Sequence, residues 1–190
     1  MALWAIAAWI RWRERWWALP FFALTGCLIL LAHLFTFGVY ALVLSTYEFG
    51  VLRYGLRQVR RELINALHLA VPALLYVIAM PHELGGMVYY RPAPLKVDQL
   101  RSVIGFYNPK FDALSLVILV LVATYGARHL RLARELVIPL VALALAYVVL
   151  PHSMGHGDFV DYRMPSVFAL FLCSSLTWRE GYQGGARKCL

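Results

Sequence analysis

Long apolar runs alternate with short polar stretches along this chain. Five runs carry no Asp, Glu, Lys or Arg, and they lie at 18–46, 63–80, 113–127, 136–150 and 164–178. A run of about 20 such residues matches the roughly 30 Å hydrocarbon core of a bilayer. A segment in lipid must be helical, because its backbone groups have no water to bond. The pattern predicts an all-α fold, a polytopic transmembrane helical bundle with four to five spanning helices.

The N-terminus has an apolar stretch followed by positive charge. Residues 1–10 precede Arg11, Arg13 and Arg15, which is the reverse of the order in a secretory signal. One interpretation is an interfacial helix held by tryptophans at head-group level. The other is the end of a span that begins upstream, so that residues 1–190, a single transmembrane domain, are a fragment of a larger membrane protein.

Two connections between the runs carry further expectations. Residues 95–107 predict a short amphipathic helix, with Leu95 and Leu100 on its apolar face and Lys96 facing outward. The connection at 128–135 is basic, whereas 151–163 holds two Asp and one Arg. Because short basic loops favour the cytoplasm, 151–163 is expected on the outer side.

Composition limits the classes of partner that the chain is expected to bind. The chain is 62% apolar and 15% charged, with a net charge of +8, whereas soluble domains are about a quarter charged. The basic residues lie beside apolar runs, which suits membrane lipids and not nucleic acid. Three cysteines lack metal-ligand spacing. No Walker, GxSxG, HExxH or GxGxxG motif occurs, so no metal and no cofactor are expected, and whether the chain is an enzyme stays open.

The densest polar cluster lies at 151–163. It contains His156, Asp158, Asp161 and Arg163 among glycines. Carboxylates beside one Arg suit a sugar hydroxyl face or a lipid phosphate. The plainer interpretation is a solvated turn in which Asp161 pairs with Arg163.

Isolated polar residues inside or beside apolar runs are the next candidates. His33 is expected either to pack against another helix or to form a proton or substrate site, because a polar group in lipid is costly. Glu48 is expected either to snorkel or to pair with Arg53, and His68 to lie at the membrane interface.

An aromatic and basic platform for a sugar or lipid phosphate is a further candidate. An ordinary interfacial belt predicts the same residue types. Its members are Tyr89, Tyr90, Arg91, Lys96, Arg101 and Tyr107.

Two stretches, LLAHLFTFGVYALVLSTYEF and YVVLPHSMGHGDFVDYRMPSVFALFL, resemble the later helices of bacterial C-type integral-membrane glycosyltransferases or their uncharacterised relatives. The likeness covers about two thirds of the chain. It includes an intramembrane His followed by an acidic residue, and the loop residues Pro151, Gly157, Asp161, Arg163 and Pro165.

The resemblance implies a multi-pass protein of the bacterial inner membrane that handles lipid-phosphate-linked sugars or cell-envelope polysaccharide. Nothing matches the family's early acidic loop, so the catalytic residues are unknown. The alternative is a non-enzymatic membrane component, such as a transporter part or an assembly subunit that works with other membrane subunits.

Overall fold

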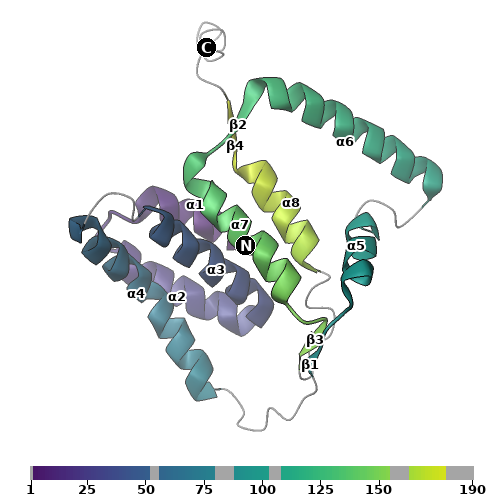
Figure 1. Ribbon diagram of the computed structural model, residues 1–190. Helices are drawn as coiled ribbons and strands as arrows, with labels where there is room; N and C mark the ends of the chain where they lie inside the picture. The colour runs from purple at the N-terminus through teal and green to yellow at the C-terminus, as the bar shows by residue number, and fades with distance from the viewer. Residues whose placement is uncertain (1, 52–55, 80–87, 103–107, 155–162, 179–190) are drawn as a thin grey trace, which may run out of the picture. The chain divides into compact units, whose positions relative to one another are not determined.

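Helices dominate the described part of this computed structural model, which comprises residues 2–51, 56–79, 88–102, 108–154 and 163–178 (Figure 1). The helices are α1 (Ala2–Trp12), α2 (Ala18–Ala32), α3 (Leu34–Val51), α4 (Leu56–Ala79), α5 (Ala93–Ser102), α6 (Pro109–His129), α7 (Val137–Val149) and α8 (Met164–Ser174). A 3-10 turn, Arg134–Leu136, precedes α7. The all-α part of the prediction therefore agrees with the structure.

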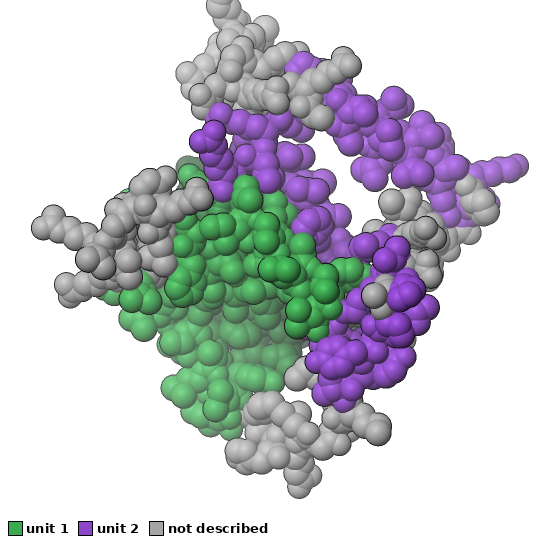
Figure 2. Space-filling model, in the orientation of Figure 1, with its two compact units in different colours: residues 1–86, 135–149 green, residues 87–134, 150–190 purple. Residues whose placement is uncertain are grey.

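The chain forms two compact units (Figure 2). The first, unit 1, comprises residues 1–86 and 135–149, and unit 2 comprises 87–134 and 150–190.

Unit 1 is a helix bundle built from α1 to α4 and α7. Within it α2 packs on α3 and α4, α7 packs on α3, and α1 packs on α2 and α3 (Figure 1). Its core side chains include Phe22, Tyr40, Leu44 and Leu143, each almost fully buried. The bundle forms because each apolar helix covers part of another, and the area removed from water stabilises the packing.

Unit 2 contains two short antiparallel strand pairs beside its helices. Strand β1 (Val88–Tyr89) pairs with β3 (Ser153–Met154), and β2 (Leu130–Leu132) pairs with β4 (Leu176–Trp178). The backbone N–H of Ala133 extends the second pairing by donating to Ser175. The pairs join segments far apart in sequence.

The predicted transmembrane bundle is wrong. Over the ranges that the structure describes, no helix has both the length and the apolar character needed to cross a membrane. Helices α7 and α8 have 13 and 11 residues, or about 20 and 17 Å at about 1.5 Å per residue. The prediction that 151–163 lies on the outer side depended on these spans, so it no longer has a basis.

The longest predicted span is interrupted at His33. This residue has an extended backbone, with φ −168° and ψ 110°, and separates α2 from α3. The fifth run ends differently from the prediction as well, because α8 stops at Ser174 and the chain continues as β4.

The predicted faces of the 95–107 helix are reversed in α5. Leu95 and Leu100 are about half exposed, whereas Lys96 is buried. The reversal arises because the Lys96 ammonium reaches a carbonyl on another segment, as described below.

Candidate functional site

The pairing of β1 with β3 brings two distant polar segments together in unit 2. Val88 lies opposite Met154, and Tyr89 lies opposite Ser153. The backbone N–H of His152 donates to the carbonyl oxygen of Tyr89 at 2.8 Å. The pairing therefore places the segment that follows β1 beside the segment that leads into β3.

Basic side chains meet at this junction. Arg91 Nη2 lies 3.3 Å from His152 Nε2. Because a guanidinium has only donors, His152 accepts through Nε2 and carries its proton on Nδ1. Lys96 Nζ donates to the carbonyl oxygen of Leu150 at 2.7 Å. We call Tyr89, Arg91, Lys96 and His152 the basic site.

The first turn of α5 positions Lys96. The backbone N–H groups of Leu95 and Lys96 both donate to the carbonyl oxygen of Pro92. The Lys96 side chain is thereby directed toward Leu150, and Lys96 is only 8% exposed. A buried ammonium is expensive unless it is bonded or paired, and the Leu150 carbonyl supplies such a bond.

Tyrosines add an aromatic component to the basic site. The rings of Tyr89 and His152 lie edge to face, with centroids 6.2 Å apart. Tyr89 and Tyr90 are both more than half exposed. Exposed aromatic rings beside cations suit a ligand that has an apolar or sugar face and an anionic group.

The structure describes only some of the site residues that the sequence predicted. His156, Asp158 and Asp161 lie outside the described residues. Arg163 is exposed and immediately precedes α8, without a side-chain cap. His33 is exposed at the break between α2 and α3, with its ring 6.3 Å from that of Phe35, so it does not lie within a continuous span.

The predicted aromatic and basic platform is only partly described. Its members Arg91 and Lys96 both contact the segment at 150–152, whereas the Arg101 side chain and all of Tyr107 lie outside what the structure describes. Sequence reasoning missed His152 as a partner of Arg91. Its place at the start of the polar loop was the available signal, but the strand pairing that positions it was not foreseen.

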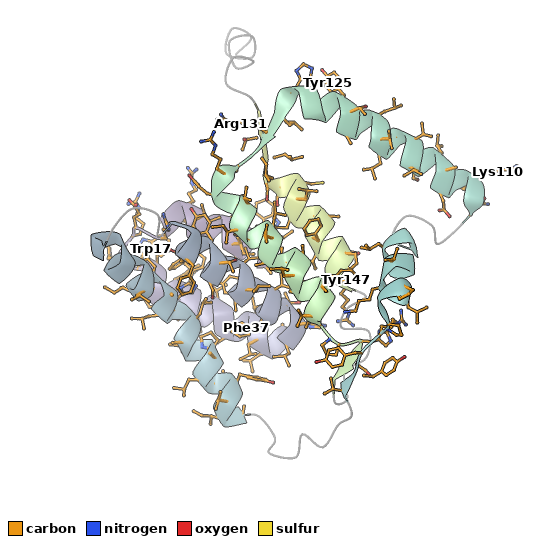
Figure 3. All side chains as sticks on the ribbon, viewed as in Figure 1. Trp17, Phe37, Lys110, Tyr125, Arg131 and Tyr147 are labelled. Carbon is orange, nitrogen blue, oxygen red and sulfur yellow. The ribbon has the colours of Figure 1, made fainter. Side chains whose placement is uncertain are left out.

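A second notable surface in unit 2 is α6. Its apolar side chains are exposed on every face, and Figure 3 shows side chains projecting from all sides of the helix between Lys110 and Tyr125. They are each about half exposed: Leu114, Leu116, Val117, Ile118, Leu119, Val120, Leu121 and Val122. Scattered apolar residues are ordinary on a protein surface, but a continuous apolar patch marks an interaction site.

No group of three or more His, Cys, Asp or Glu side chains in the described ranges is arranged to hold a metal ion. The basic site itself offers a guanidinium from Arg91 and an ammonium from Lys96.

Comparison with known proteins gives no relative. No protein-family model matches the chain, and no curated protein or solved structure is significantly similar to it.

Proposed function

We propose that the protein binds a phosphate-bearing lipid through the basic site. The observation that carries the proposal is the convergence of Arg91 and the buried Lys96 on the segment at 150–152. A guanidinium and an ammonium together recognise phosphate well, since one offers a planar fork and the other a point charge. The net charge of +8 favours anionic partners as well.

The rest of unit 2 supports a lipid as the source of that phosphate. The exposed apolar surface of α6 suits contact with acyl chains, because such contact removes apolar side chains from water. The exposed Tyr89 and Tyr90 suit a sugar ring next to the phosphate. Handling of lipid-linked sugars stays a prediction, and so does the inner-membrane setting with other membrane subunits.

The test is binding to vesicles of phosphatidylcholine with and without phosphatidic acid. Arg91→Gln should weaken binding to phosphatidic acid vesicles about tenfold, because a hydrogen bond to a charged group is worth about 1.5 kcal/mol. The matched control is Arg131→Gln, which removes the same charge from an exposed position in β2. It should change binding less than twofold.

Three outcomes count against the proposal. Equal losses in both variants would show general electrostatic attraction, and no loss in Arg91→Gln would remove the basic site from consideration. Full competition by millimolar inorganic phosphate would identify free phosphate as the ligand and overturn the lipid assignment.

A further inference from the structure

A buried polar cluster in unit 1 joins three helices. Trp9 of α1 is fully buried, and its indole N–H donates to Glu48 Oε1 at 2.6 Å. Arg13, which directly follows α1, donates to Glu48 Oε2 at 3.0 Å and lies over the ring of Tyr47 at 5.2 Å. Both oxygens of a carboxylate on α3 are therefore occupied by groups from the N-terminal segment.

His68 of α4 completes this arrangement. Its ring stacks on Trp9, with centroids 3.9 Å apart and planes 31° apart. Its Nδ1 lies 2.5 Å from the carbonyl oxygen of Asn65. A carbonyl accepts only, so Nδ1 carries the proton and Nε2 presents a lone pair. We call Trp9, Arg13, Glu48 and His68 the Glu48 cluster.

Among the described residues, the buried Nε2 atom of His68 has no hydrogen-bond partner. The same holds there for the buried hydroxyl of Tyr40, whose ring lies 6.3 Å from that of His68. Buried polar atoms are nearly always paired, and each exception requires an explanation. Protonation of Nε2 would raise the free-energy cost of burying this ring, because it would bury an unbonded donor and a charge.

We propose that the Glu48 cluster is a pH-operated latch that holds α1 on the bundle and releases it when His68 takes up a proton. Helix α1 depends on this cluster because only Ile6 and Trp9 are buried among its residues. Protonated His68 becomes favourable only when it reaches water, and to reach water it must leave the face of Trp9.

Among the groups around it, His68 is the one whose protonation changes near neutral pH. The ring of Tyr40 in α3 lies against it, and Trp9, which stacks on it, bonds to Glu48. The other oxygen of Glu48 bonds to Arg13, which lies over Tyr47. Helix α2, which packs on α4, carries no Asp, Glu, Lys, Arg or His. Only histidine ordinarily titrates between pH 5 and 8. Burial raises the pKa of Tyr40 well above its usual range, so its hydroxyl stays protonated.

The direction of the response follows from linkage. Burial lowers the pKa of His68 below its ordinary value of 6.5 in the closed state, whereas the open state titrates at that ordinary value. Closure is fully favoured above pH 6.5 and weakens as the pH falls through it. Between pH 7.5 and 5.5 the opening equilibrium should rise, with about tenfold as the upper limit.

Amide hydrogen exchange on the full chain tests the latch. Protection factors, corrected for the intrinsic pH dependence of exchange, should fall by up to about tenfold in residues 2–12 between pH 7.5 and 5.5, whereas residues 63–79 of α4 keep theirs. In His68→Gln the protection of residues 2–12 should be independent of pH. Tyr40→Phe is the matched control, because it removes the other buried hydroxyl and leaves His68 in place, and it should keep the wild-type pH response.

Three results would overturn the latch. They are an unchanged wild-type α1, an equal pH response in His68→Gln, and a simultaneous loss of protection in α1 and α4. If His68→Gln does not fold, the fluorescence of Trp9 in the wild-type chain replaces it, with Trp9→Phe to isolate the signal. Release of α1 should change that fluorescence with a midpoint at or below pH 6.5, and a flat signal would contradict the proposal. None of these readouts depends on lipid binding.

Discussion

Glu48 shows what a charged residue requires inside an apolar bundle. It is 2% exposed and is bonded by Trp9 and Arg13, which lie 39 and 35 positions away along the chain. From the sequence, Glu48 was expected either to snorkel or to pair with Arg53, and because Arg53 lies outside the described residues, that pairing stays a prediction. The contacts with Trp9 and Arg13 were not foreseen, because they depend on how α1 packs on α3.

Glu48→Gln should destabilise the chain by about 3 kcal/mol. The variant keeps the shape and one acceptor for Trp9 but leaves Arg13, whose side chain is 17% exposed, without its counter-charge. Breaking a buried pair from one side is costly for this reason. Urea denaturation measures the change. Glu14→Gln, at an exposed position, is the control and should cost no more than about 1 kcal/mol; equal costs would show that the burial of Glu48 has little effect.

Lys96→Met should separate stability from binding. The substitution removes the hydrogen bond to the Leu150 carbonyl, but it also removes the cost of burying an ammonium. The two effects oppose each other, so the free energy of unfolding should change by less than about 1 kcal/mol. Binding to phosphatidic acid vesicles should nevertheless fall about tenfold, as for Arg91→Gln. Normal binding in a stable Lys96→Met would show that the ammonium serves the fold alone.

At the scale of elements, the apolar runs predicted where helices lie but not where they end. The run at 18–46 contains no Pro or charge near its middle, yet His33 breaks it. The strand pairs were also missed, since two- and three-residue strands such as β1 and β4 carry no periodicity. Such pairs form only when segments from distant parts of the chain meet. The pairing of β1 with β3 brings His152 into the candidate site.

Two glycines within helices should respond oppositely to alanine. A Cβ at Gly26 in α2 would lie 3.1 Å from Pro72 Cγ in α4, whereas nothing lies within 4 Å at Gly38 in α3. Pro72 is rigid and buried, so Gly26→Ala should destabilise by about 1 kcal/mol after its gain in helix propensity is counted. Gly38→Ala should stabilise by about 0.5–1 kcal/mol. Thermal unfolding compares them, and stabilisation in both would mean that α2 and α4 separate easily.

At the scale of the whole molecule, the apolar runs and the composition predicted a membrane bundle, and over the described ranges that prediction was wrong. Composition did not predict how the apolar residues divide between bundle cores and exposed faces. Leu143 of α7 is fully buried, whereas Leu121 of α6 is 62% exposed, although both lie in apolar runs of similar length. The difference depends on which helices find partners, and that is a property of the fold.

This contrast gives a direct test of the apolar surface. Val117 and Leu121 of α6 are 54% and 62% exposed, so changing both to Ser should alter the free energy of unfolding by no more than about 0.5 kcal/mol per site. If acyl chains cover these side chains, the double variant loses about 2 kcal/mol of vesicle binding, or roughly thirtyfold. Leu143→Ser is the control with the opposite profile, because its buried side chain should cost stability and leave the binding of the folded fraction unchanged. Unaltered vesicle binding in the α6 variant, alongside a loss in Arg91→Gln, would mean that the phosphate group is recognised without the acyl chains.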